Sequence, residues 1–215
     1  MIYREAGQFH SRYQEDQRIF PIRQDRFAIG AILLAAFVAV PFAGNDYWFS
    51  AILIPFLILS LAALGLNILT GYAGQLSLGS AAFMAVGAFA AFNLMLRVPG
   101  MPLLLAFFLA GLVTAAVGLF FGLPSLRIKG FYLAVTTLAA QFFIEWALTK
   151  FAWFSNRNPS GVISAQKMVI LGYRFASPVS RYLLTLSIVV VLALAAKNLV
   201  RSRIGRAWMA VRDMD

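Results

Sequence analysis

The sequence contains no cysteine, and only one of its 215 residues is histidine. The missing cysteines exclude a disulfide, a thiol nucleophile and a cysteine-ligated metal site. The single histidine, His10, lies in a polar N-terminal segment, and no carboxylate pair recurs at helical spacing in the membrane portion of the chain. The groups needed for nucleophilic or acid–base catalysis are therefore missing. We expect no enzyme activity, no cofactor and no metal.

A nucleotide-binding motif is also absent. The P-loop pattern G-x-x-x-x-G-K-[ST], whose main-chain N–H groups hold phosphates, occurs nowhere in the chain. If ATP drives a process in which this chain takes part, another subunit must bind the nucleotide.

Charge is scarce, whereas hydrophobic residues are abundant. Charged side chains make up 12% of the chain, against about 25% in typical soluble proteins. Hydrophobic residues make up 61%, and the mean hydropathy is +0.81. Apolar runs of about 20 residues recur, and each can cross a bilayer as a helix. The sequence predicts an all-α polytopic transmembrane bundle with about six spans, near residues 27–43, 47–70, 81–96, 102–123, 131–154 and 182–200.

The basic residues flank these spans and form no continuous stripe. The net charge of +10 therefore indicates contact with anionic lipid headgroups and not with nucleic acid. We divide the chain into a polar cytoplasmic arm (1–26), a membrane domain (27–200) and a cytoplasmic segment (201–215). The positive-inside rule places both termini in the cytoplasm. The loop 155–181 then lies outside, although it carries four basic residues, a partial conflict that its length reduces.

Residues 71–80 (GYAGQLSLGS) separate two apolar runs and carry no charge. The stretch is rich in glycine, and its polar side chains include Gln75 and Ser77. Non-helical backbone at membrane depth is tolerated where it is buried in protein or lines a cavity, and transporters use such interrupted helices to contact their cargo. The alternative is a short turn whose small residues allow close helix packing. We expect an interrupted helix here, and the residues alone leave both interpretations open.

Glu145 is the one acidic residue within the predicted spans, because the other acidic residues lie in or beside polar segments. An ionisable group inside a membrane segment indicates a functional role by default. Gln141 lies one helical turn before it, so the two can share a face. The alternative is that Glu145 lies near the outer end of its helix and reaches water or Lys150.

The C-terminal residues 201–215 (RSRIGRAWMAVRDMD) follow the last predicted span. A basic flank after a transmembrane helix explains the arginines but not the interleaved small and apolar residues. From Arg206 onward the pattern predicts a short helix that could dock into the groove of a partner protein.

Three blocks of the sequence resemble the permease subunits of bacterial ABC importers for branched-chain amino acids. The first comprises residues 63–79 (ALGLNILTGYAGQLSLG), with 81–83 and 87–88. The second is 126–134 (LRIKGFYLA) followed by Thr137 and Leu138, and the third is 202–207 (SRIGRA) with 210–213. In order, they cover most of residues 50–215.

The resemblance implies a transport subunit without its own ATPase site, located in the bacterial inner membrane. Such permeases work with a second related permease, two cytosolic ATPases and an extracytoplasmic solute-binding protein. By analogy, Asn67, Gln75 and Ser77 lie near the substrate path, and we add Glu145 as a candidate. The family's ATPase-coupling loop corresponds to Ser202, Arg203, Gly205, Arg206, Ala207, Ala210, Arg212 and Asp213.

The chain departs from the family pattern in three places. Ser80 stands where relatives commonly have histidine, and residues 156–161 (NRNPSG) replace a glycine-rich outer loop. Relatives also continue through further transmembrane helices after the coupling loop, so the chain looks like the N-terminal part of a permease.

We therefore expect ATP-driven import of branched-chain or related amino acids, with the substrate undecided among amino acids, amides and urea. The alternatives are a truncated remnant without transport activity, such as a membrane scaffold, and a secondary transporter that works without an ATPase. A secondary transporter would need ionisable residues in several spans, and only Glu145 comes close. An integral-membrane enzyme would need a cluster of catalytic residues at one membrane face, which the sequence lacks.

Overall fold

The computed structural model describes residues 23–125, 131–158, 162–163, 169–170 and 173–213. Within them, six helices are long and apolar enough to cross a membrane, which confirms the predicted number. They comprise residues Gln24–Ala43, Trp48–Tyr72, Ser80–Arg97, Leu103–Leu123, Tyr132–Lys150 and Pro178–Arg201. The regular structure of the described residues is helical apart from one two-stranded ribbon, in which β1 (Val169–Ile170) pairs antiparallel with β2 (Tyr173–Arg174).

The first span combines α2 (Arg23–Leu34), the π-helical segment Ala35–Ala39 and α3 (Val40–Ala43). Helix α2 begins four residues before the predicted start at residue 27. The second span starts with the π-helical segment Trp48–Leu53 and continues as α4 (Ile54–Asn67). Pro55, predicted to kink this span, lies at the start of α4, directly after the junction with the π-helical segment.

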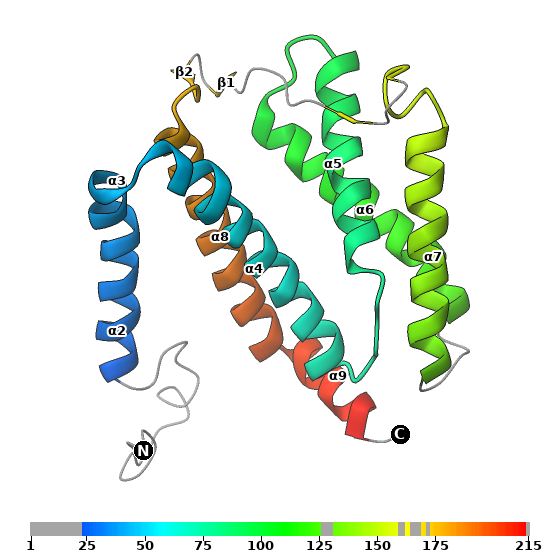
Figure 1. The fold of residues 1–215 in the computed structure, drawn as a ribbon. Helices are drawn as coiled ribbons and strands as arrows, with labels where there is room; N and C mark the ends of the chain where they lie inside the picture. Colours follow the sequence, from blue (N-terminus) through cyan, green and yellow to red (C-terminus); the bar gives the residue numbers. More distant parts are fainter. Residues whose placement is uncertain (1–22, 126–130, 159–161, 164–168, 171–172, 214–215) are drawn as a thin grey trace.

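The second span ends in a third π-helical segment, Ile68–Tyr72. Non-helical backbone follows it and reaches α5 (Ser80–Arg97). Figure 1 shows this link passing from the end of α4, beside α9, toward the start of α5. Residues 73–79 are non-helical, in agreement with the break predicted near residues 71–80, and they join two helices that are each long enough to span a membrane.

Helices α5, α6 (Leu103–Ser125) and α7 (Phe131–Lys150) form one packed group (Figure 1). Their core contains the buried residues Ala82, Val86, Ile144 and Leu148, against which Phe121 and Phe154 pack. Gly118 of α6 faces the Phe83 ring of α5, and a Cβ there would lie 3.5 Å from the ring, in ordinary van der Waals contact. Helix α7 ends at Lys150 and not at Phe154 as predicted, since residues 152–157 form turns.

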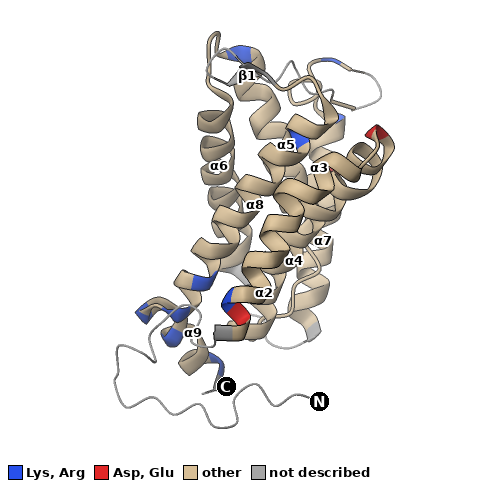
Figure 2. Ribbon diagram, turned by 90° about the vertical axis from the view of Figure 1, so that its left-hand side faces the viewer, with Lys and Arg blue, Asp and Glu red and all other residues tan. Residues whose placement is uncertain are grey.

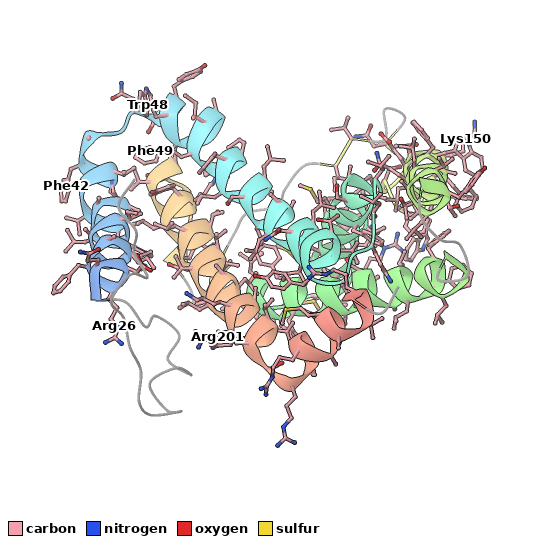
Figure 3. All side chains as sticks on the ribbon, turned by 90° about the horizontal axis from the view of Figure 1, so that it is seen from below. Arg26, Phe42, Trp48, Phe49, Lys150 and Arg201 are labelled. Carbon is pink, nitrogen blue, oxygen red and sulfur yellow. The ribbon has the colours of Figure 1, made fainter. Side chains whose placement is uncertain are left out.

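Helix α8 (Pro178–Arg201) packs against α4 and the π-helical segment before it (Figure 1). Phe49 is fully buried here, and its ring lies 5.3 Å from that of Tyr182. The Tyr182 hydroxyl donates a hydrogen bond of 3.1 Å to the Ala36 carbonyl oxygen. In Figure 3, Phe49 lies beside α8, whereas Phe42 points away from the bundle. Tyr182 thus ties α8 to the first span.

The start of α2 and helix α9 (Arg203–Asp213) lie at the same end of the bundle (Figure 1). Several Lys and Arg residues lie at this end, and others lie at the opposite end (Figure 2). Many large apolar side chains on the spans are exposed, Phe56 and Phe120 among them. Such faces need lipid or other helices against them.

Candidate functional site

The interrupted segment 73–79 is fixed at both of its ends. Hydrogen bonds of 3.1 Å join Ala73 N–H to the Ile68 carbonyl and Gln75 N–H to the Leu69 carbonyl. Gly74 has φ +70°, a left-handed conformation that glycine adopts without strain. Further along, Leu78 N–H donates to the Thr137 hydroxyl of α7 at 2.9 Å. The segment is therefore held in a defined path by partners on two helices.

Gly79 is buried where the segment meets α7. A Cβ at this position would lie 3.1 Å from the Thr137 carbonyl oxygen, so a larger residue would push the segment away from α7. Thr137 thus contacts the segment through both its hydroxyl and its main chain.

A cavity of about 550 Å³ lies between this segment and helices α5, α6 and α7. Its volume is within the usual range for sites of small molecules. Apolar groups dominate the wall, and no charged side chain lines it. The polar side chains are contributed by Gln75, Ser77, Thr136, Thr137 and Gln141. The arrangement suits an uncharged or zwitterionic molecule with an apolar part.

Gln141 lines this cavity and carries an unpaired polar atom. Its Oε1 is buried and has no hydrogen-bond partner within the described part of the chain. Leaving such an acceptor unpaired costs about 1–3 kcal/mol. A ligand that supplies an N–H or O–H donor would satisfy it.

The structure separates the four predicted path residues. Gln75 and Ser77 line the same cavity. Asn67 lines a different one, of about 440 Å³, between α4 and α8 with Tyr72 and Lys197. Its amide also lies against Gly71, because a Cβ there would come 3.0 Å from Asn67 Oδ1.

Glu145 lies apart from the other three, on a small cavity of about 200 Å³ that Thr149 also lines. Its side chain is exposed, and no ion pair between Glu145 and Lys150 is present among the described residues. Gln141 and Glu145 thus line different cavities, although they are one turn apart on α7.

Thr136, Thr137 and Gln141 line this cavity, although none of them was predicted to lie on the substrate path. Gln141 was expected to share a face with Glu145, and Thr137 was named only within a resembling block. The signal was present, because residues 137 and 141 are polar positions four apart in an apolar helix and so share one face.

A tight turn joins α8 to α9. Ser202 ends α8, and its hydroxyl donates to the Leu199 carbonyl at 2.6 Å and accepts from Ile204 N–H at 3.2 Å. It thereby caps the start of α9. Gly205 is buried, and a Cβ there would overlap the main chain of Val200. These contacts explain the serine and the glycine of the SRIGRA block. The helix expected from Arg206 starts three residues earlier, at Arg203.

Helix α9 reaches back to the interrupted segment. Arg212 donates a hydrogen bond of 2.6 Å from Nη1 to the Gly71 carbonyl oxygen. Its stem also lies over Gly74, where a Cβ would come 2.6 Å from Arg212 Cγ. Four further predicted coupling residues are exposed, and these are Arg203, Arg206, Ala207 and Ala210. The resembling residues 126–130 lie outside the described residues.

Comparison with known proteins identifies the family. The model of the branched-chain amino acid transport system permease component matches residues 48–214. The chain belongs to this permease family. Its resemblance to the family, predicted from the three sequence blocks, is confirmed.

Two relatives are high-affinity branched-chain amino acid transport system permease proteins LivM. The protein from Salmonella typhimurium is 32% identical over 173 residues, which cover 70% of this chain and 40% of the relative. The protein from Escherichia coli K12 is 29% identical over 217 residues, 89% of this chain and 49% of the relative. The chain thus spans less than half the length of each of these relatives. No solved structure matches the chain significantly.

Proposed function

We propose that the chain is a transmembrane subunit of an ABC importer that passes branched-chain or related amino acids across the bacterial inner membrane. Separate cytosolic subunits bind and hydrolyse ATP. A second related permease completes the membrane part, and an extracytoplasmic solute-binding protein delivers the substrate. In this proposal the end of the bundle that carries α9 faces the cytoplasm, so that the N- and C-terminal segments are both inside.

The contact between α9 and the interrupted segment is the observation that carries this proposal. Arg212 binds the Gly71 carbonyl oxygen, and its stem covers Gly74. Gly74 directly precedes Gln75, which lines the cavity between α5, α6 and α7. Helix α9, whose exposed residues would contact the ATPase subunit, therefore also contacts the backbone of residues 71–74 next to the cavity.

The α9 contact supports a mechanism for coupling. ATP binding and hydrolysis in the partner subunits displace α9, and Arg212 transmits this displacement to residues 71–75. The displacement moves Gln75 and Ser77 relative to Thr137, to which Leu78 is bonded, and alters the cavity. Directed transport requires that the substrate has different affinities for the outward-open and inward-open states.

Reconstitution of the complete importer into proteoliposomes tests this function. We expect uptake of radiolabelled leucine only when the solute-binding protein is outside and ATP is inside. Uptake driven by a proton gradient without ATP would instead establish a secondary transporter. Absence of uptake under both conditions would contradict transport by this chain.

A further inference from the structure

The cavity beside the interrupted segment has polar groups of opposite hydrogen-bonding character on two different elements. Gln141, on α7, offers a buried acceptor oxygen that has no partner. Ser77, on the segment, accepts from Gly79 N–H at 3.3 Å. Its hydroxyl proton has no acceptor within the described residues, so it is available to a ligand. The two side chains line the same cavity.

The hydroxyls of Thr136 and Thr137 are already used. Thr136 donates to the Tyr132 carbonyl, and Thr137 donates to the Ala134 carbonyl while it accepts from Leu78 N–H. These threonines therefore fix the local backbone, whereas Gln141 and Ser77 have hydrogen-bonding capacity left over.

The rest of the wall is apolar. Phe83, Phe121, Leu133 and Ile144 line the cavity from α5, α6 and α7. Burial of an aliphatic group against such a wall is favourable, because it removes apolar surface from water. Binding of a substrate with a charged side chain would be costly, because no oppositely charged residue lines the cavity.

We propose that this cavity binds a zwitterionic amino acid with an aliphatic side chain during its passage. Gln141 Oε1 accepts a hydrogen bond from the substrate ammonium, and the Ser77 hydroxyl donates one to the carboxylate. The apolar wall holds the side chain. This inference rests on the proposed function for its class of substrate, and it assigns Gln141 as a specificity-determining residue.

Cysteine accessibility tests the location of the site. These 215 residues contain no cysteine, so Ser77→Cys adds a thiol that no other residue of this sequence supplies. In the complete importer, we expect N-ethylmaleimide to alkylate this thiol and saturating leucine to slow the reaction about tenfold. 4-Methyl-2-oxopentanoate has the same carbon skeleton and carboxylate but no ammonium, and we expect it to protect much less. Ser177→Cys, at an exposed position directly before α8, is the control and should react equally with and without leucine.

The accessibility test has clear contrary outcomes. An unchanged alkylation rate in the presence of leucine would overturn the proposal. A Ser77→Cys thiol that never reacts would show that another helix fills the cavity, which would also overturn it. Equal protection by leucine and the keto acid would remove the role assigned to Gln141.

Transport kinetics test Gln141 itself. Loss of a hydrogen bond to a charged group should raise the half-saturating leucine concentration of Gln141→Leu about tenfold. The matched control Ser187→Ala removes a hydroxyl that bonds only the Leu183 carbonyl of its own helix, and should leave this value unchanged.

The two proposals fail in different ways. If the wild-type importer takes up leucine with ATP while Gln141→Leu matches it, the binding inference is wrong and the importer function stands. If leucine protects Ser77→Cys but ATP drives no uptake, the site stands and the ABC function is wrong.

Discussion

The Arg212 guanidinium donates a hydrogen bond of 2.6 Å to the Gly71 carbonyl oxygen, although 141 positions separate the two residues. The bond joins a helix at the end of the described chain to the start of the interrupted segment. It is available because a π-helical segment ends at Tyr72 and non-helical backbone follows. Carbonyl groups at a helix end lack an intrahelical partner and accept side-chain donors. A basic side chain is a favourable partner there.

We expect Arg212→Ala to weaken coupling between ATP hydrolysis and transport. Coupling between linked sites is typically worth about 1–3 kcal/mol, so leucine uptake per ATP hydrolysed should fall about fivefold or more. Uptake and ATPase activity are measured on the same proteoliposomes. Lys150→Ala, at the opposite end of the bundle, is the control (Figure 1). An unchanged ratio of uptake to hydrolysis in Arg212→Ala would contradict a role for the Arg212–Gly71 bond.

Substitution of the small exposed residues of α9 tests partner docking. A bulky charged side chain, as in Ala207→Glu or Ala210→Glu, should prevent close approach of the ATPase and reduce the amount that co-purifies. Asp46→Lys is the control, because Asp46 is exposed and lies between the first two spans, Gln24–Ala43 and Trp48–Tyr72. If the ATPase co-purified at the wild-type yield with both α9 variants, the docking assignment would be wrong.

Gly74→Ala should destabilise the interrupted segment. A left-handed conformation costs a residue with a Cβ about 1–2 kcal/mol, and this Cβ would also displace the Arg212 stem. We expect a lower unfolding temperature in detergent. Gly111→Ala provides the comparison, because its Cβ would enter open space on α6, and we expect it to be neutral or stabilising. Equal unfolding temperatures for the two variants would argue against the strained geometry at Gly74.

Asn93→Ala should destabilise the end of the bundle that lies away from α9. Asn93 is buried, and its amide donates to the Phe89 and Phe154 carbonyls at 2.8 and 2.9 Å. Its Oδ1 accepts from Arg97, whose guanidinium lies 3.7 Å from the centre of the Trp153 ring. Removal of the amide leaves buried groups unpaired at a cost of about 1–3 kcal/mol. Asn198→Ala, an exposed position on α8, is the matched control, and thermal unfolding of both variants decides the point.

The sequence by itself determined the class of the fold and the family. Apolar runs of membrane-spanning length predicted six spans, because a bilayer fixes how many residues a helix needs to cross it. The glycine-rich block predicted the interruption near residues 71–80, since glycine tolerates the left-handed conformation found at Gly74. The orientation of the bundle remains a prediction from the positive-inside rule, and the partners and the coupling role of α9 remain predictions from the resemblance.

The tertiary structure decided which polar residues lie together. Gln75 and Ser77 line one cavity with Gln141, whereas Asn67 and Glu145 lie on two others. No local pattern could give this grouping, because it depends on how α5, α6 and α7 pack around the interrupted segment. The Arg212–Gly71 bond likewise joins residues distant in the sequence. Spacing along a helix predicts which residues share a face, but only packing determines what that face contacts.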